Sequence, residues 1–423
     1  MRILLISHGF PPDSVGGVEQ HTEGLAHALA ELGHEVHVYA KTGVTAKPQG
    51  TRIGPTGSNP SITRVVYRYE GLDGLRSLYA VPTLEESFDE FLATHSFDVA
   101  HVHHLTGMST GLLEVLARHG VPSVLTLHDY WLMCPRGQMW RDDGSVCDAV
   151  EVSRCADCLR PTFGGWIDDA SVAELHDAAR RTLDVATALV VPSARAIPPF
   201  AALGVAPERI RVVENGVDTS ALRAVPPVDA LREGPVRIGF LGTLIPSKGL
   251  DVLVEALMRL PAKSAELHVH GNAVPYHGDE SYLTRVFQRL DPGRPRVTYH
   301  GPYQTRELPE ILASIDLLVA PALWREAFGL TVREALAAGR PAVVSRIGGL
   351  EDALEHGRDG LFVAPGSVDE LADALERLTS DRAELGRLAA ASRESAATRG
   401  FEEMAAELAE LYRGIASLER TPE

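Results

Sequence analysis

The order strand, loop, helix, strand occurs twice along this chain, first at its start and again past its midpoint. Arg2–Ser7 has the apolar run of a short buried strand, and a loop rich in Gly and Pro follows it. Residues 18–32 carry apolar side chains at helical spacing, Gly33 is a stop signal, and Glu35–Tyr39 predicts the next strand. Such a unit opens a doubly wound parallel sheet.

The second unit has the same order of elements. Val236–Leu241 predicts a strand, Gly242–Gly249 a loop, Leu250–Leu260 an amphipathic helix and Glu266–His270 another strand. A chain of 423 residues is also too long for one ordinary hydrophobic core. We therefore predict an α/β fold of two Rossmann-like domains facing a central cleft, with the ligand at the carboxyl ends of the strands.

The remaining strand signals set the domain limits. Further strands are expected at Val99–Val102, Ser123–Leu127, Ala188–Pro192, Val297–Tyr299, Leu317–Ala320 and Pro341–Ser345. The irregular stretch 215–234 contains two consecutive prolines and is the expected hinge. We predict an N-terminal domain over residues 1–215 with a cysteine-rich insert at 134–165, a C-terminal domain over 216–400, and a last helix over 401–423 that crosses back to the first domain.

The charge balance narrows the range of partners. The chain has 57 acidic and 40 basic side chains, and its formal net charge is −17. An acidic surface repels nucleic acid backbones and anionic lipid headgroups, so we expect neither as a partner. The sequence lacks an apolar run of the roughly 18 to 20 residues that a membrane span needs, and its opening segment reads as a strand instead of a signal peptide. We expect a cytoplasmic protein; the sequence does not indicate its oligomeric state.

The segment Pro321–Ser345 carries the strongest chemical signal. A strand ends near Pro321, a loop contains Glu326, and a helix is expected from about Gly329 to Ala338. A helix N-terminus at the end of a parallel strand binds anions through its N–H groups and its dipole. Glu334 follows Glu326 by eight positions, about 12 Å if the stretch were helical, which is too far for the carboxylate pair of a glycosidase. The alternative is a surface helix residue and a solvated loop acid.

Five ordered motifs resemble those of the family 4 retaining glycosyltransferases, which have the GT-B fold. EAFGLTVREALAAGRPAV looks like the E-x7-E signature of this family, and MRILLISHGFPPDSVGGVEQH is similar to its opening strand and glycine loop. LTLHDYW resembles the strand end that bears its histidine, VVENGVD its interdomain turn, and GFLGTLIPSKGLDVLVEA its lysine-bearing loop. The similarity covers nearly the whole chain.

The resemblance implies roles for the residues of the glutamate motif. Glu326 would bind hydroxyls of the transferred sugar, and Glu334 would bind the ribose of a nucleotide diphosphate donor. Phe328, Gly329 and Leu330 would supply backbone donors to the sugar and the phosphates.

Matching residues elsewhere complete the implied site. Lys248 would neutralise the diphosphate, Gly17 would close over it from the first domain, and His128 would lie beside the anomeric carbon. A lysine and a helix N-terminus can stabilise a departing nucleoside diphosphate without a metal, so we expect no catalytic metal. We take His128, Glu326 and Lys248 as the candidate catalytic residues.

One position departs from the family pattern. The family usually has an Arg shortly before the Lys, and here Thr243 stands at that place. Either Arg237, Arg325 or Arg346 substitutes for it, or the donor is held more weakly.

Other residues near the predicted strand ends allow two interpretations each. His128 is either a donor contact or a core histidine beside Asp129. His101, His103 and His104 suggest a metal site but are more typical of cleft or packing residues after a strand. Gly271 either makes a simple turn or contacts the donor.

All 4 cysteines lie in one stretch with the spacing C-x12-C-x7-C-x2-C: Cys134, Cys147, Cys155 and Cys158. A reducing compartment disfavours disulfides, and four thiolates fill the coordination shell of a structural zinc ion. An iron–sulfur cluster would use the same ligands. The remaining alternative is four reduced thiols in an inserted loop that shapes the acceptor side of the cleft.

The predicted function is retaining transfer of a sugar from a nucleotide diphosphate to a small-molecule or glycan acceptor, in polysaccharide or natural-product biosynthesis. The main alternative is a catalytically silent sugar-nucleotide-binding protein. A GT-B sugar isomerase or phosphorylase is weaker, because nothing indicates a pyridoxal lysine. A NAD-dependent oxidoreductase ranks last, since the chain lacks the glycine fingerprint with an acidic partner roughly 20 residues later.

Overall fold

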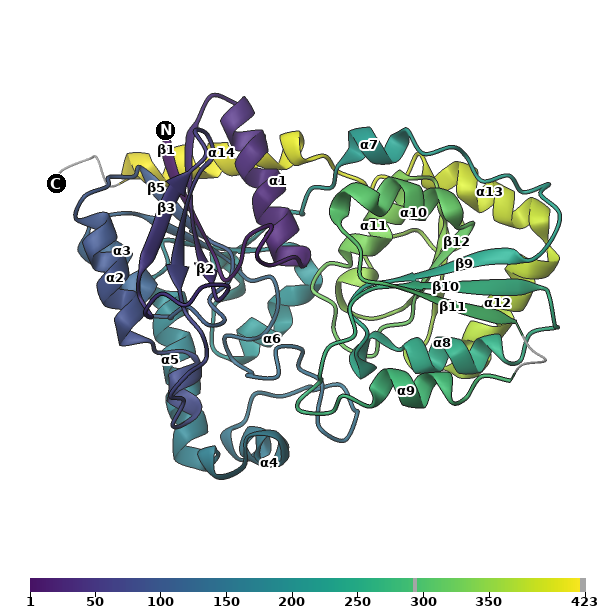
Figure 1. The fold of residues 1–423 in the computed structure, drawn as a ribbon, viewed down its shortest axis with the longest axis horizontal. Helices are drawn as coiled ribbons and strands as arrows, with labels where there is room; N and C mark the ends of the chain where they lie inside the picture. The colour runs from purple at the N-terminus through teal and green to yellow at the C-terminus, as the bar shows by residue number, and fades with distance from the viewer. Residues whose placement is uncertain (292–294, 419–423) are drawn as a thin grey trace. The chain divides into compact units, whose positions relative to one another are not determined.

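The computed structural model describes residues 1–291 and 295–418, and these form two compact units (Figure 1). Unit 1 comprises Met1–Asp142, Asp148–Gly216 and the chain from Gly400 onward. Unit 2 comprises Val217–Arg399 together with the short segment Asp143–Cys147. Each unit is an α/β sandwich around its own sheet, so the fold predicted from the repeated strand–helix order is confirmed.

The sheet of unit 1 has eight strands in the order β3-β4-β2-β1-β5-β6-β7-β8. Their bounds are β1 Arg2–Ser7, β2 Glu35–Thr42, β3 Arg52–Thr56, β4 Ser61–Val66, β5 Val99–Val102, β6 Ser123–Thr126, β7 Ala188–Val191 and β8 Ile210–Val212. All neighbours pair in parallel except β3, which runs antiparallel to β4 at the edge. The central strands β1, β5 and β6 are buried almost throughout because helices cover both faces of a parallel sheet.

The sheet of unit 2 has six parallel strands in the order β11-β10-β9-β12-β13-β14. Their bounds are β9 Val236–Leu241, β10 Ala265–His270, β11 Arg296–Gly301, β12 Leu317–Ala320, β13 Ala342–Ser345 and β14 Gly360–Val363. In each sheet the first strand of the unit lies in the middle, where the strand order reverses. Ligands of doubly wound sheets bind outside the carboxyl ends of the strands at this switch point.

Helices cover both faces of each sheet (Figure 1). Unit 1 contains α1 Gly17–Glu31, α2 Pro82–Leu92, α3 Leu112–Arg118, α4 Val152–Phe163, α5 Asp169–Val185, α6 Ile197–Ala202 and α14 Phe401–Leu418. Unit 2 contains α7 Thr219–Arg223, α8 Leu250–Leu257, α9 Tyr282–Phe287, α10 Leu308–Ser314, α11 Leu330–Ala337, α12 Val368–Ser380 and α13 Arg382–Ser392. In unit 2, α10 and α11 lie on the opposite side of the sheet from α8 and α9.

The C-terminal helix α14 packs against α1 in unit 1, as the sequence predicts. Met404, Leu408 and other apolar side chains of α14 join the core that α1 and the central strands form. The two helices approach closely at Gly24, where a Cβ atom would lie 2.3 Å from the Phe401 ring. Glycine is therefore required at this crossing.

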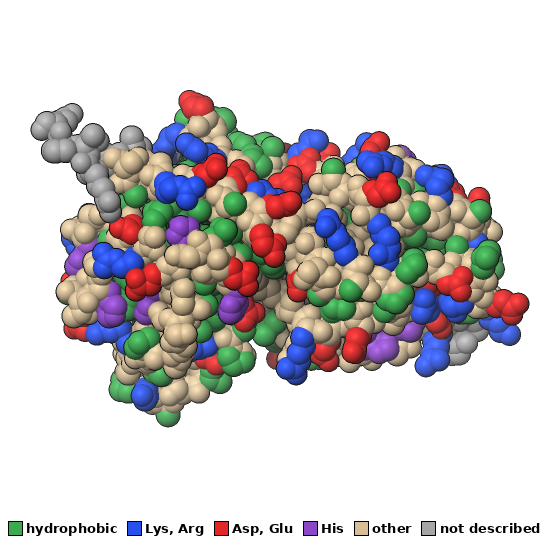
Figure 2. Space-filling view, turned by 90° about the horizontal axis from the view of Figure 1, so that it is seen from above, with side chains coloured by type: hydrophobic (Ala, Val, Ile, Leu, Met, Phe, Trp, Pro, Cys, Tyr) green, Lys and Arg blue, Asp and Glu red, His purple; other side chains and the backbone are tan. Residues whose placement is uncertain are grey.

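Two properties of the surface bear on the expected partners. On the face shown in Figure 2, acidic and basic side chains are interspersed instead of gathered by sign. In the part of the chain that the structure describes, no helix has both the length and the apolar character needed to cross a membrane.

Candidate functional site

In unit 2, the loops after β9 and β12 meet at the switch point of the sheet. Lys248 ends a short 3-10 turn, Pro246–Lys248, in the loop after β9. The N–H of Leu323, in the loop after β12, donates to the carbonyl of Ser247 at 2.8 Å. Gly249 makes this approach possible: its φ is +73°, and a Cβ atom there would lie 2.1 Å from the carbonyl oxygen of Pro321.

Lys248 and Glu326 form an ion pair across these two loops. The Nε1–H of Trp324 donates to the same carboxylate oxygen of Glu326 at 3.0 Å, and the Lys248 ammonium lies 5.2 Å from the centre of the Trp324 ring. The side chains of Lys248 and Glu326 are 28% and 12% exposed, so a ligand can reach both. The sequence predicted the two charged residues but not Trp324, whose indole orients the carboxylate.

The loop after β13 holds the backbone of Glu326 in place. The N–H of Gly349 donates to the carbonyl of Glu326 at 2.6 Å. A Cβ atom at Gly348 would lie 2.5 Å from that carbonyl oxygen, and one at Gly349 would lie 2.4 Å from the carbonyl oxygen of Ala327. Two consecutive glycines therefore allow the two loops to contact each other through their backbones.

Helix α11 begins directly after this loop, as predicted, with Gly329 as its N-cap at φ +80°. Among the described residues, the N–H groups of Phe328, Gly329 and Leu330 donate to no backbone acceptor. The Arg333 guanidinium lies 3.6 Å from the centre of the Phe328 ring and donates to the Phe328 carbonyl. The three N–H groups thus lie at a helix N-terminus that Arg333 holds through its contacts with Phe328. Such a terminus is suited to bind an anion.

Glu334 is a buried carboxyl in the middle of α11, 7% exposed. Burial raises its pKa to about 7, because removal from water disfavours the charged form. Its charge in turn raises the pKa of Tyr303, although burial is the larger cause there. The alternative of a solvated surface residue is therefore wrong for Glu334.

The structure distinguishes the three arginines that could replace the missing one at Thr243. Arg237 lies at the start of β9, the end opposite to the site, where its guanidinium bonds the buried carboxylate of Asp316 at 2.5 Å. The prediction that Arg237 could replace the missing arginine is therefore wrong. Arg325 and Arg346 both lie in loops at the carboxyl ends of strands, and Thr243 itself is exposed.

Gly271 follows β10 and has a structural role that the sequence did not show. Its φ is +152°, and a Cβ atom there would lie 1.8 Å from the carbonyl oxygen of Gly242. The N–H of Gly242 donates to the carbonyl of His270 at 3.0 Å. Glycine at this position lets the ends of β9 and β10 lie side by side.

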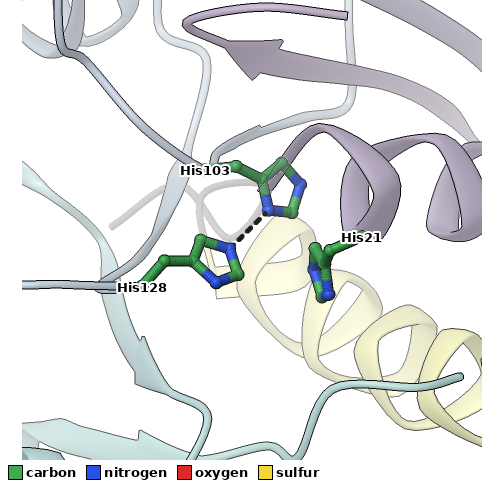
Figure 3. Close-up of side chains that lie close together, drawn as sticks. All are labelled: His21, His103 and His128. Atoms are coloured by element: carbon green, nitrogen blue, oxygen red, sulfur yellow. Dashed lines mark hydrogen bonds between the residues drawn. The ribbon is translucent and has the colours of Figure 1, made fainter. Parts of the chain in front are cut away.

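In unit 1, histidines gather at the carboxyl ends of β5 and β6 and on α1. His103 follows β5, His128 follows β6, and His21 projects from the second turn of α1 (Figure 3). The Nδ1 of His103 and the Nε2 of His128 are 3.3 Å apart. Burial, followed by the nearby His21, holds the pKa of His128 well below its usual range, so the ring is neutral.

The neighbouring histidines have other partners. Both ring nitrogens of His101 are hydrogen-bonded, one to the Tyr412 hydroxyl at 2.5 Å and one to Thr126 Oγ1 at 2.6 Å. His101 is thus a packing residue that links β5 to α14. The Nε2 of His104 lies 3.1 Å from Asp129, so this carboxylate pairs with His104.

Gly17 is the first residue of α1 and is exposed. A Cβ atom at Gly17 would meet no protein atom within 4 Å, unlike one at Gly16, which would lie 2.7 Å from the Glu19 carboxylate. Protein packing in the described structure therefore requires no glycine at position 17.

The four cysteines lie on three separate parts of the chain. Cys155 and Cys158 are on α4, Cys134 is in a turn after β6, and Cys147 belongs to the segment that groups with unit 2. In the described residues, the histidines 21, 103 and 128 form the group with ligand atoms close enough for a metal ion, and the cysteines form none. A metal held by the cysteines stays a prediction.

Comparisons with known proteins agree with this geometry. The family model described as Glycosyltransferase Family 4 matches residues 15–221, and that described as Glycosyl transferases group 1 matches residues 235–381. Glycogen synthase of Mycobacterium tuberculosis is 27% identical over 430 residues, which cover 100% of this chain and 97% of the relative.

Solved structures show the same fold. Sucrose-phosphate synthase from Thermosynechococcus elongatus matches with a TM-score of 0.74 at 21% identity, covering 99% of each chain. Anabaena Alr3699/HepE in complex with UDP-glucose matches with a TM-score of 0.67 at 19% identity, covering 98% of this chain and 100% of that one.

The two parallel sheets, the glutamate loop at a helix N-terminus and these matches define a glycosyltransferase with the GT-B fold. The chain belongs to the family 4 glycosyltransferases.

Proposed function

We propose that this glycosyltransferase moves a sugar, with retention of anomeric configuration, from a nucleotide diphosphate to a small-molecule or glycan acceptor. The observation that carries the proposal is the Lys248–Glu326 pair beside the N–H groups of Phe328, Gly329 and Leu330, which donate to no backbone acceptor in the described part of the chain. These groups place one cation and three backbone donors at the end of one sheet, which is what a diphosphate leaving group requires.

Unit 2 is the proposed donor-binding domain. Lys248 would contact the phosphates, and its present partner Glu326 would turn to hydroxyls of the transferred sugar. Glu334 would accept hydrogen bonds from the ribose hydroxyls, which is a role for a carboxylate. Its burial keeps part of the population protonated near neutral pH in the absence of a ligand.

Arg325 and Arg346 are the proposed replacements for the charge missing at Thr243. Both follow strand ends on the donor side of the sheet, Arg325 directly before Glu326 and Arg346 directly after β13. The Arg346 guanidinium lies 4.9 Å from the centre of the Phe362 ring, which leaves its donors available to a phosphate.

Unit 1 is the proposed acceptor-binding domain, and two of its residues, Gly17 and His128, are also proposed to contact the donor. Open space at the Cβ position of Gly17 supports a close approach of the diphosphate to the start of α1. His128 would contact the donor sugar as a neutral ring. In a retaining reaction the departing phosphate oxygen takes the proton of the acceptor hydroxyl as the new glycosidic bond forms.

UDP-sugars are the first donors to test, because Anabaena Alr3699/HepE has been solved with UDP-glucose. Assembly of a polysaccharide or glycolipid is the setting that the relatives suggest for the acceptor. We also propose that the acceptor is soluble and that the protein acts in the cytoplasm.

The test is Glu326→Gln. This change removes the carboxylate that would bind the donor sugar but keeps the size of the side chain, so we expect nucleotide release from a donor to fall by at least about 100-fold. The melting temperature should change little, because a partly exposed ion pair contributes only about 0 to 1 kcal/mol.

Glu310→Gln, an exposed change on α10, is the matched control and should keep wild-type turnover. Wild-type turnover in Glu326→Gln would contradict the site. Donor binding without any released nucleotide in the wild type, across donors and acceptors, would favour the silent sugar-nucleotide-binding protein instead.

A structural metal at Cys134, Cys147, Cys155 and Cys158 is a second, separate proposal, supported by their spacing in the sequence. Burial raises the pKa of the Cys158 thiol, so a bound cation would be needed to keep it as a thiolate. We expect Cys155→Ser to release metal and to lower the melting temperature. An unchanged melting curve with no metal in elemental analysis of the wild type would reject it.

A further inference from the structure

Three histidines converge on one point at the carboxyl edge of the unit 1 sheet (Figure 3). Each comes from a different element: His21 from α1, His103 from the end of β5 and His128 from the end of β6. One ligand nitrogen of each lies within 4.8 Å of the others. The convergence therefore depends on the β1–β5–β6 strand order, which a pattern along the sequence does not reveal.

The polar atoms of this group lack enough hydrogen-bond partners. Both ring nitrogens of His21 and the Nε2 of His103 are buried and have no partner in the described structure. His21 is 3% exposed and His103 is 0% exposed. A buried nitrogen without a hydrogen-bond partner is costly, so a metal ion bound to a ring nitrogen of His21 would relieve an existing cost. On His103 the nitrogen that faces His128 is Nδ1, so the relief concerns His21.

The spacing of the rings suits a metal ion. The 3.3 Å between His103 Nδ1 and His128 Nε2 is long for a hydrogen bond. It matches the separation of about 3.3 Å between two nitrogens that each bind a tetrahedral zinc at about 2.0 to 2.1 Å. The His21 ring is 4.7 Å from that of His128 and 5.1 Å from that of His103, edge-on to both.

The surroundings of the three rings bear on a metal ion. His21 and His103 are buried, and a neutral imidazole offers one nitrogen lone pair to a metal. A cavity of about 30 Å³ adjoins His103 and His128 and is large enough for one water molecule; His21 does not line it.

We propose that His21, His103 and His128 form a binding site for a divalent transition metal that prefers imidazole ligands, Zn²⁺ first among them. Three histidines and one water make up an open zinc site. The inference goes beyond the proposed function and shares with it only His128, which is left unchanged in the test.

The experiment titrates chelator-treated protein with Co²⁺, a coloured substitute for Zn²⁺, without any nucleotide. The wild type should show the visible absorption of one equivalent of four-coordinate Co²⁺ on nitrogen ligands, apart from any Co²⁺ held by the cysteines. His21→Gln and His103→Gln should each weaken binding at least about tenfold. His27→Gln is the matched control, because His27 is exposed on the same helix α1, and it should bind like the wild type.

A second variant guards against a failure to fold. His21→Cys replaces the ligand by another metal ligand and should keep the bound Co²⁺ while adding a thiolate charge-transfer band. Such a band in the wild type would instead report metal at the four cysteines, so the two metal proposals are read separately.

Two results would overturn the proposal: a wild type that shows no nitrogen-bound Co²⁺ spectrum, or glutamine variants that fold and bind as well as His27→Gln. Neither result bears on nucleotide binding by unit 2, which is measured without metal.

Discussion

At the scale of single residues, the candidate site combines groups that the sequence identified with groups that only the fold reveals. Lys248 and Glu326 could be predicted because each lies in a motif that resembles the family. Trp324 and His21 could not, since their importance arises from contacts with Glu326 and His128 that depend on loop packing and strand order. The prediction for Arg237 was wrong for a similar reason. Its closeness to Lys248 in sequence does not show that it lies at the opposite end of β9 from the site.

Glu334 offers a pH-dependent test of the donor domain. Its folded-state pKa of about 7 exceeds the ordinary value, so the unfolded chain ionises first as the pH rises. Wild-type stability is then lost progressively from about pH 4.5 up to about pH 7, where the folded protein also ionises. Gln cannot ionise, and Glu334→Gln should therefore gain up to about 3 kcal/mol relative to the wild type between pH 5 and pH 8.

Denaturant titrations at the two pH values, without nucleotide, measure this difference. Glu310→Gln changes an exposed position, so its free energy of unfolding should differ from that of the wild type by the same small amount at both pH values. A pH-independent difference for Glu334→Gln would show that the folded carboxyl ionises normally.

At the scale of elements, the apolar runs predicted the central strands well, and β1, β5, β9 and β12 begin and end where expected. The edge strand β3, its neighbour β4 and the short strands β8 and β14 were not predicted. β3 contains Gly54 and Pro55, residues that disfavour strands, and it is largely exposed, so it lacks the apolar pattern of a buried strand. Contacts between loops, such as the hydrogen bond from the Gly349 N–H to the Glu326 carbonyl, join segments far apart in the sequence, and a local sequence pattern cannot predict them.

Gly249→Ala tests whether the approach of the β9 and β12 loops builds the site. Gly249 and Gly278 have similar positive φ values, +73° and +86°, so alanine costs about 1 to 2 kcal/mol of backbone strain at either. Only at position 249 would the new Cβ also meet a carbonyl oxygen, that of Pro321. We expect Gly249→Ala to be the less stable variant and to lose most donor turnover, because Lys248 is displaced from Glu326.

Gly278→Ala is the matched control and should keep near wild-type turnover with a modest drop in melting temperature. Equal effects of the two substitutions on stability and turnover would mean that the contact between the loops is not needed.

At the scale of the whole molecule, the repeated strand–helix order predicted two Rossmann-like units, and the terminal helix was correctly placed against the first. The short segment Asp143–Cys147 groups with unit 2 although it lies within the predicted insert of the first domain. Sequence patterns record local periodicity and could not foresee this grouping. Two Rossmann-like units with charged loops at their switch points are the architecture from which the donor chemistry is inferred.

The central claim is that unit 2 binds a nucleoside diphosphate through Lys248 and the N-terminus of α11. The most direct test is a thermal-shift panel of UDP, GDP, ADP, CDP and dTDP on the wild type and on Lys248→Ala. A nucleotide at about a hundred times its Kd should stabilise the wild type by about 2.7 kcal/mol, a rise of several degrees, and Lys248→Ala should lose this rise. No response of the wild type to any nucleotide, or an equal response of the variant, would contradict the claim.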